Sequence, residues 1–486
     1  MKSILNFFYT SWGYIALILL LCIGILKAPY IISIFLIGLI CCICLLEAMK
    51  FKLWLGFHKP SDVLVNETRP MVSVHLAICN EPPYMVISTL KEILKQEYAQ
   101  IEIIVVDNNT TERDSWVPVE DFCSTLPNVR FFHLEKWPFF KSGALNFARK
   151  VTHRNAEFVF VIDADYRLTP NALELAVSNF DRPNTALVQF PQAYQCDSKR
   201  HVPLIAEFDH FFDFYCFKAD TCHGALATGT LSLIKITALD KVGGWPTNSI
   251  TEDAELGARL QVAGYDIKYV PRIIGKGIAP IEQEDFIKQR KRWIFGNVQT
   301  LMNYSMRPWH NFEKWVSGVS QLTAWINMLG MPILILLCCL MLTPWLNQAT
   351  FVHLSGGAYI AYWIFILSKI VQLQLDQGRR GAGAFRTFLI HFSSLDIGAF
   401  DWWPAMWGKN RPFIRTNKNK VRSDYKVNLL YPFLHLSLFF CALGFDSIII
   451  AVNAFTFATL HVMATRFDYL CRAGTNSQIA LNLKLH

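Results

Sequence analysis

The hydrophobic pattern begins with two nearly uninterrupted apolar runs, 12–26 and 31–46, separated by the short link Lys27-Ala28-Pro29. Runs of this length and the turn between them predict a transmembrane helical hairpin over residues 1–50. A cleaved signal peptide is the alternative interpretation. The second apolar run follows immediately and no small-residue cleavage pattern separates the two, so the hairpin is favoured.

Between residues 65 and 310 the pattern changes to short β-rich runs alternating with helical periods, which predicts a globular α/β domain. Four runs have the continuous apolar character of buried parallel strands: Met71 to Ile78, Ile101 to Val106, Val129 to His133 and Phe158 to Ile162. Polar residues follow three of these strands at Asn80-Glu81, Asp107 to Asn109 and Asp163 to Asp165. Because ligands bind beyond the carboxyl ends of strands in open α/β sheets, we expect the site there.

After Trp309 the apolar runs return and predict a C-terminal region of transmembrane and interfacial helices over residues 311–466, with a cytosolic tail at 467–486. The runs are 322–346, 356–375, 429–444 and 448–462, and the last two predict a second hairpin around Asp446. Arg379-Arg380 and the basic run 409–426 both favour the cytoplasm. Residues 385–407 are therefore predicted to form an interfacial segment, with Trp402, Trp403 and Trp407 at headgroup level.

Composition agrees with a soluble domain fused to membrane helices. The 486 residues are 52% hydrophobic, 14% aromatic and only 17% charged, which is too apolar for an ordinary soluble protein. The net charge of +8 comes from basic residues beside apolar runs, so it indicates lipid headgroups and cytoplasmic orientation, and no nucleic-acid partner is expected. Lys50, Lys52 and Lys59 follow the first hairpin and place the α/β domain in the cytoplasm, with the helices in the inner (plasma) membrane.

Asp163-Ala164-Asp165 is the sharpest local signal, because a hydrophobic strand delivers two carboxylates separated by one residue. Such a pair suits a divalent cation, Mg²⁺ or Mn²⁺, that neutralises the diphosphate of a nucleotide sugar. A solvated turn at a strand end is the ordinary alternative for any short acidic pair.

Thr251-Glu252-Asp253 stands at the start of a helical pattern further along the chain. A carboxylate at a helix start, in a partly dehydrated cleft, can take the proton from an attacking sugar hydroxyl. A simple helix N-cap, with Glu252 and Glu255 favourable to the helix dipole, explains the same residues.

Gln289-Arg290-Lys291-Arg292-Trp293 places amide, guanidinium and indole groups within little more than one helical turn. Arginine can bind a diphosphate with two hydrogen bonds, and tryptophan offers a flat face to a sugar ring. A basic helix beside the membrane, with an interfacial tryptophan, is the alternative.

Taken in order, Asp107, Asp163-Ala164-Asp165, Thr251-Glu252-Asp253 and Gln289 to Trp293 resemble the family 2 glycosyltransferases, which include cellulose, chitin and hyaluronan synthases. The resemblance spans the whole predicted soluble domain. The segments Asp107 to Thr110, Trp137 to Phe147 and Gly229-Thr230-Leu231 are most similar to the bacterial β-glucan synthase branch.

This resemblance implies a cytosolic GT-A domain with a Rossmann-like α/β fold between two sets of transmembrane helices. It also implies an inverting, processive hexosyltransferase that uses a nucleotide sugar, with UDP-glucose as the first candidate donor and a β-linked polysaccharide as product. Export of the polymer through the membrane, with export subunits as further partners, is the associated expectation. A non-processive transferase with a lipid acceptor and an inactive export scaffold are the rival interpretations.

The resemblance assigns donor-binding residues position by position. Asn80, Glu81 and Asp107 contact the uridine, and Lys141 lies near the nucleotide. Asp163 contacts the nucleotide and Asp165 binds the metal, so that these two form the metal pair. Many relatives carry a second aspartate directly after the first, where this chain has Asn108.

The acceptor side is assigned in the same way. Asp253 is the catalytic base, with Glu252 as a substrate-binding neighbour. Arg292 holds the diphosphate and Trp293 the acceptor end. The remaining expected substrate-binding residues are Thr228, Gly229, Thr230, Gln289 and Arg290.

Overall fold

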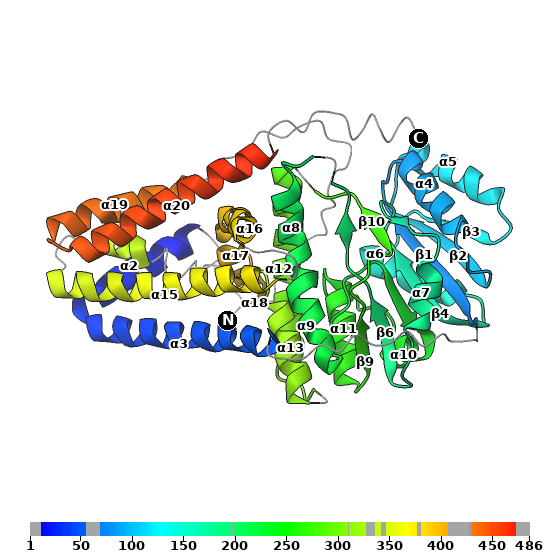
Figure 1. Ribbon diagram of the computed structural model, residues 1–486, viewed down its shortest axis with the longest axis horizontal. Coiled ribbons are helices and arrows are strands. Elements are labelled where there is room, and N and C mark those ends of the chain that lie inside the picture. The colour runs from blue at the N-terminus through cyan, green and yellow to red at the C-terminus, as the bar shows by residue number, and fades with distance from the viewer. Residues whose placement is uncertain are drawn as a thin grey trace.

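The structure is a computed structural model that describes residues 11–54, 69–196, 198–280, 282–309, 311–326, 336–341, 347–376, 381–406, 427 and 429–472. A bundle of long apolar helices lies at one end and an α/β domain at the other (Figure 1). A layer of helices, α8, α12 and α13, crosses between them, with α16, α17 and α18 beside it (Figure 1). The predicted α/β domain fused to membrane-type helices is therefore confirmed as an architecture.

The α/β domain is built on a seven-stranded mixed sheet in the order β3-β2-β1-β4-β8-β6-β9. Its strands are β1 (Met71–Ile78), β2 (Ile101–Asn108), β3 (Val129–Leu134), β4 (Ala156–Ile162), β6 (Thr185–Gln189), β8 (Ser232–Lys235) and β9 (Asp266–Tyr269). The four predicted strands pair in parallel, as expected. The short strand β8, which the sequence pattern did not reveal, runs antiparallel to β4 and β6 and makes the sheet mixed.

Helices cover both faces of this sheet. They are α4 (Pro83–Leu94), α5 (Arg113–Ser124), α6 (Phe140–Val151), α7 (Ala172–Ser178), α10 (Ile236–Lys241) and α11 (Glu252–Val262). Successive side chains of β4 enter different cores: Phe160 and Ile162 pack in one, Val159 and Val161 in the other. This two-sided burial explains why the strand is a continuous apolar run and not an alternating one. A small second sheet joins β5 (Arg167–Leu168), β10 (Gly275–Gly277) and β7 (Ala193–Tyr194).

The layer next to the bundle comprises α8 (Val202–His210), the π-helix η1 (Phe211–Cys216), α9 (Phe217–Ala219), the 3-10 turn η2 (Asp220–Cys222), α12 (Gln283–Tyr304) and α13 (Phe312–Leu322). Helix α13 is bonded to the α/β domain: Lys314 Nζ lies 2.5 Å from Asp266 Oδ1, and Gln321 Oε1 accepts the Leu226 N–H at 2.9 Å. Helix α13, which begins just after the expected boundary at residue 310, therefore packs directly against the α/β domain.

The bundle consists of α2 (Ser11–Lys27), α3 (Pro29–Trp54), α15 (Gln348–Leu375), α19 (Leu430–Gly444) and α20 (Ile448–Arg472). Within the described residues, three helical segments have the length and apolarity to cross a bilayer: Pro29–Phe51, Gln348–Leu375 and Ile448–Arg472. Large apolar side chains point away from the bundle, with Ile34 69%, Phe433 63% and Ile449 76% exposed. An outer surface of this kind is suited to lipid.

The C-terminal helices match the expected hairpin around Asp446, and α20 continues to Arg472, past the expected limit at 466. The expected interfacial segment forms three short helices, α16 (Ala382–Ser393), α17 (Leu395–Phe400) and α18 (Trp403–Met406). Trp402 does not lie at an open surface: it is 7% exposed and packs in the cluster that contains Trp325. Lys59, Arg379-Arg380, Trp407, the run 409–426 and most of 322–346 lie outside the described residues.

Candidate active site

Asp107 ends β2 as part of a buried hydrogen-bonded group. Its Oδ1 accepts from Thr110 Oγ1 at 2.6 Å, its Oδ2 lies 2.7 Å from His133 Nδ1, and Trp116 stacks on His133 with ring centroids 4.1 Å apart. Burial raises the pKa of Asp107, although both neighbours favour the ionised form. The Asn80 N–H donates to Thr110 Oγ1 at 2.8 Å, so the expected uridine contacts of β1 and β2 lie side by side.

Asn108 and Asn109 fix the loop that follows β3. Asn108 Nδ2 donates to the Phe140 carbonyl at 3.1 Å, and Asn109 exchanges two hydrogen bonds with the Trp137 backbone. Phe139 and Phe140 adopt φ angles of 68° and 49°, in the left-handed region that bulky residues rarely enter. The amide at position 108 therefore positions the loop that leads into α6, the helix that carries Lys141.

Lys141 connects the carboxyl end of β4 to the loop before β8. Its Nζ lies 2.6 Å from Asp163 Oδ1 and 2.7 Å from the Gly229 carbonyl. Burial would lower the pKa of Lys141, but Asp163, Glu252 and Asp253 outweigh burial and raise it. Thr230 Oγ1 accepts the Asp163 N–H at 3.0 Å, so the structure brings Lys141, Asp163, Gly229 and Thr230 together.

The pair Asp163 and Asp165 offers hard oxygen donors at this strand end. Asp163 is partly exposed, whereas Asp165 is 8% exposed. Within the described part of the chain, no group of three or more His, Cys, Asp or Glu residues could hold a metal ion. Two carboxylates fit a Mg²⁺ or Mn²⁺ ion that takes its other ligands from substrate phosphates and water.

Glu252 and Asp253 begin α11. Thr251 occupies the N-cap position, but its hydroxyl makes no cap hydrogen bond, and Asp253 Oδ1 accepts the adjacent Ala254 N–H at 2.8 Å. Burial and the neighbouring Asp253 raise the pKa of Glu252 to about 7, and burial also raises the pKa of Asp253. A simple N-cap does not account for these carboxylates, because the cap bond itself is absent.

Gly229 is required where the loop meets Asp253. Its φ is +83°, and a Cβ atom at this position would lie 2.7 Å from Asp253 Oδ2. Glycine alone permits both the backbone conformation and this close approach. Gly229 therefore places the Lys141-bound loop directly beside Asp253.

Asp253 also lines a pocket on the side facing α12 and α13, which we call the acceptor pocket. Its empty space, part of which is open to solvent, is about 570 Å³, and its lining includes Gln192, Tyr194, Thr228, Asp253, Trp293, Asn297, Gln321 and Trp325. Among the described residues that line it, Asp253 supplies the only carboxylate. Flat aromatic faces with a few amide groups are suited to sugar rings. Sequence reasoning identified Thr228 and Trp293 but missed Gln192, Asn297, Gln321 and Trp325, which carry no motif.

The residues of the motif Gln289 to Trp293 on α12 lie at two different sites. Trp293 lines the acceptor pocket, and the charge of Arg292 lowers the pKa values of Glu252 and Asp253, so both lie on the transferase side. Arg290 is instead 3% exposed, ion-paired with Glu207 and stacked on Trp325 at 3.6 Å. Gln289 Oε1 is buried without a hydrogen-bond partner among the described residues. The structure thus places Arg290 outside the acceptor pocket.

Lys141→Met is expected to move the acid limb of the kcat/KM profile to higher pH. The Lys141 ammonium lowers the pKa values of Glu252 and Asp253, so its removal raises both values and leaves a smaller ionised fraction of the two carboxylates at a given pH. The measurement is transfer rate between pH 5 and 9. Lys136→Met, which removes an exposed lysine from the loop just before α6, is the control, and an equal or absent shift in both variants would contradict the assignment.

The mixed sheet with carboxylates at its C-terminal edge has the fold of the GT-A type of glycosyltransferase. More particularly, residues 158–369 match the family described as Glycosyl transferase family group 2, so this part of the chain carries a glycosyltransferase family 2 domain.

Relatives with this domain include polysaccharide synthases. The chain is 26% identical over 257 residues to the UDP-forming cellulose synthase catalytic subunit of Xanthomonas axonopodis pv. citri, covering 51% of this chain and 34% of the relative. It is 28% identical over 235 residues to poly-beta-1,6-N-acetyl-D-glucosamine synthase of Staphylococcus epidermidis, covering 48% and 55%. The aligned region thus spans less than two thirds of either relative.

Among solved structures, the fold resembles mannosyltransferase PcManGT from Pyrobaculum calidifontis in complex with GDP-Man and Mn²⁺. The TM-score is 0.51 at 19% identity, with 79% of this chain and 100% of that chain covered. At this identity the likeness establishes the fold.

Proposed function

We propose that the chain is an inverting hexosyltransferase that extends a β-linked polysaccharide from a nucleotide-sugar donor, with UDP-glucose as the first donor to test. One observation carries this proposal: Asp253 lies between the Lys141–Asp163 ion pair on one side and an aromatic pocket on the other. A base in this position stands between a donor site and an acceptor site.

The relatives support this class of substrate. The two relatives named above are both named as polysaccharide synthases, and one name specifies UDP as a product. The solved neighbour holds GDP-Man and Mn²⁺. These names support a nucleotide-sugar donor and a polymer product, while the donor sugar itself is a proposal that rests on the resemblance to β-glucan synthases.

The geometry supports a single displacement. Asp253 accepts the proton of an acceptor hydroxyl, and that oxygen attacks the anomeric carbon as its bond to the nucleoside diphosphate breaks. Among the described residues that line the acceptor pocket, Asp253 supplies the only carboxylate, so its role as base leaves no second carboxylate there to serve as a nucleophile. Attack from the face opposite the leaving group converts an α-linked donor into a β-linked product.

The departing diphosphate is stabilised by cations on the donor side. Lys141 already bridges Asp163 and Gly229, and Arg292 lies close enough to influence both carboxylates of α11. Asp163 and Asp165 would hold Mg²⁺ or Mn²⁺, which when bound supplies further charge neutralisation of the diphosphate. Because these residues stabilise the leaving group, their loss is expected to lower kcat more than donor affinity.

The helical bundle suits a multi-pass protein of the inner (plasma) membrane with a cytoplasmic transferase domain. The three bilayer-length segments and their exposed apolar side chains support this placement. The acceptor pocket lies on the side of the domain that faces the bundle, as the positions of α12 and α13 in Figure 1 show. A polymer made there is close to a route across the membrane, so coupled export with partner subunits belongs to the proposal.

Purified full-length protein in nanodiscs is expected to incorporate radiolabel from UDP-glucose, to lose this activity with EDTA and to regain it with Mn²⁺. Asp165→Asn should lower the rate by about 10²-fold or more and require a higher Mn²⁺ concentration, since it removes one hard ligand. Digestion with glycosidases measures product length. Long product supports the proposal, and a single sugar on lipid supports the non-processive rival.

Label from UDP-N-acetylglucosamine or GDP-mannose, but not from UDP-glucose, would correct the donor and leave the fold-based activity in place. If the protein still binds nucleotide but incorporates no label from any of the three donors, the proposed activity is overturned.

A further inference from the structure

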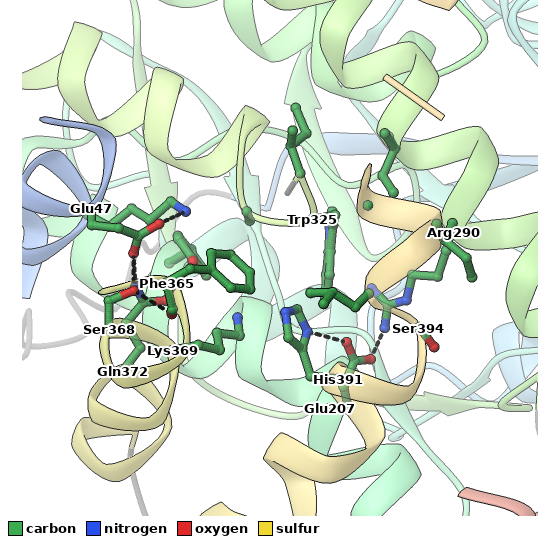
Figure 2. Close-up of a pocket in the computed structure, with 18 of the residues that line it drawn as sticks. Glu47, Glu207, Arg290, Trp325, Phe365, Ser368, Lys369, Gln372, His391 and Ser394 are labelled. Atoms are coloured by element: carbon green, nitrogen blue, oxygen red, sulfur yellow. Dashed lines mark hydrogen bonds and ion pairs between the residues drawn. The ribbon is translucent and has the colours of Figure 1, made fainter. Parts of the chain in front are cut away.

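A second cavity, which we call the interface cavity, lies where the membrane-type helices meet the transferase domain. Its empty space, part of which is open to solvent, is about 520 Å³, and its polar lining includes Glu47, Lys50, Glu207, Arg290, Ser368, Lys369, Gln372 and His391. These side chains come from α3, α8, α12, α15 and α16 (Figure 2). Trp325 lines both this cavity and the acceptor pocket, while Asp253 lines the acceptor pocket alone.

Both carboxylates of the cavity have cationic or polar partners. Glu47 Oε1 accepts from Lys50 Nζ at 2.7 Å, and Oε2 accepts from Ser368 Oγ at 2.8 Å and Gln372 Nε2 at 2.7 Å. Glu207 is ion-paired with Arg290, and its Oε1 lies 3.4 Å from His391 Nδ1. Each carboxylate is thus matched by one permanent cation, Lys50 or Arg290.

Lys369 is the remaining lysine of the cavity lining. It is 4% exposed, and within the described part of the chain its amino group forms no ion pair within 4 Å and no hydrogen bond, while the Tyr215 ring centroid lies 5.7 Å away. Figure 2 shows Lys369 between the Glu47 group and the Glu207 group. Arg290 Nε and Nη1 likewise have no acceptor among the described residues. Buried N–H groups without an acceptor are costly, so an acceptor group inside the cavity would satisfy Arg290 Nε, Arg290 Nη1 and Lys369 Nζ together.

We propose that the interface cavity binds a phosphate group, with Lys369 Nζ and the unused N–H groups of Arg290 as donors. The cavity lies at the level where apolar helices give way to the transferase domain, which is the level of lipid headgroups. Basic pockets between membrane helices on the cytoplasmic side are suited to phosphate headgroups, and guanidinium and ammonium groups bind phosphate well. This site takes no part in sugar transfer as described above, so the phosphate-site proposal can be tested independently of the proposed donor.

Lys369→Met separates a ligand-binding role from a structural one. Methionine has a similar length and no charge, so a lysine that is merely buried is replaced without loss of stability or with a gain. If Lys369 binds phosphate, the substitution leaves the protein folded and removes phosphate binding. Lys369→Gln is the second variant should the methionine variant fail to fold, and Lys288→Met removes a surface lysine from α12 as the matched control.

The test uses the full chain in neutral detergent and three probes: inorganic phosphate, dihexanoyl phosphatidic acid and dihexanoylglycerol, which lacks phosphate. Affinities come from titration calorimetry, with the shift in unfolding temperature as a second readout. We expect phosphatidic acid to bind and dihexanoylglycerol not to bind. Lys369→Met should weaken the affinity for phosphatidic acid at least tenfold, because one charge-assisted hydrogen bond is lost. Lys288→Met should bind phosphatidic acid as tightly as the wild type.

The probes also distinguish the sources of phosphate. Phosphatidic acid that binds at least tenfold more tightly than inorganic phosphate identifies a lipid headgroup, whereas equal affinities identify free phosphate. Either result supports a phosphate site if it depends on Lys369. Equal binding by wild type and both Lys369 variants, or no phosphate-dependent binding by folded wild type, would overturn the proposal.

Discussion

Asp253→Asn is expected to lower kcat by about 10² to 10⁴-fold with little change in donor affinity, because general-base catalysis contributes a factor of this size. Asparagine keeps the shape of the side chain and can still contact the Ala254 N–H, so the start of α11 is retained. The measurement is steady-state transfer from the labelled donor, with donor affinity measured separately by calorimetry.

Glu252→Gln is the matched control because it removes the adjacent carboxylate from the same helix start. Glu252 does not line the acceptor pocket, and its pKa of about 7 leaves it partly protonated at neutral pH. We expect this variant to keep kcat within about tenfold of the wild type, which is below the range for loss of a general base. A greater loss in Glu252→Gln than in Asp253→Asn would transfer the base role to Glu252.

The pH dependence follows from the direction of the shifts. In the proposed mechanism Asp253 accepts a proton only when it is ionised, and burial raises its pKa above the ordinary value of an aspartate. Wild-type activity should therefore fall as the pH drops through this raised pKa. The residual activity of Asp253→Asn should not show this fall at acid pH, because the titrating carboxylate is gone. An unchanged acid limb in the variant would assign the limb to another group.

The strands of the transferase domain were predictable because a sheet buried on both faces leaves a continuous apolar run. Strands β1, β2 and β4 have this pattern and lie where expected, and the edge strand β3, which is only partly buried, also lies where expected. Strand β8 has only the span Ser232–Lys235, and its antiparallel pairing depends on partners far away in sequence. No local pattern records such a pairing, so the mixed character of the sheet emerges only in three dimensions.

The site was predictable as a set of motifs but not as two separate cavities. Arg290 and Arg292 are two residues apart on α12, and residues at this spacing point to different sides of a helix. Sequence alone does not show which side faces the acceptor pocket, so both were expected to bind substrate. Trp325 lies on a segment expected to cross the membrane, and only its packing against Trp293, with ring centroids 5.7 Å apart, places it at the site.

Arg290→Ala is expected to lower the free energy of unfolding by about 3 to 5 kcal/mol, the cost of leaving one partner of a buried ion pair alone. Glu207 is 4% exposed, and although burial favours its neutral form, Arg290 and His391 hold its pKa below the usual value. Burial lowers the pKa of Arg290 to about 10, so both partners are charged at neutral pH. The substitution also removes the contact of the guanidinium with Trp325.

The chain offers a matched comparison in Arg149, which binds Asp240 at the surface with hydrogen bonds of 2.9 and 2.6 Å. Arg149→Ala should cost about 0.2 to 1 kcal/mol, because water screens an exposed pair. Urea unfolding in detergent, followed by tryptophan fluorescence, measures both. The double variant Glu207→Gln/Arg290→Met should regain most of the stability, since it leaves no buried charge unpaired. Equal losses in Arg290→Ala and Arg149→Ala would show that the buried pair is not a structural link between α8 and α12.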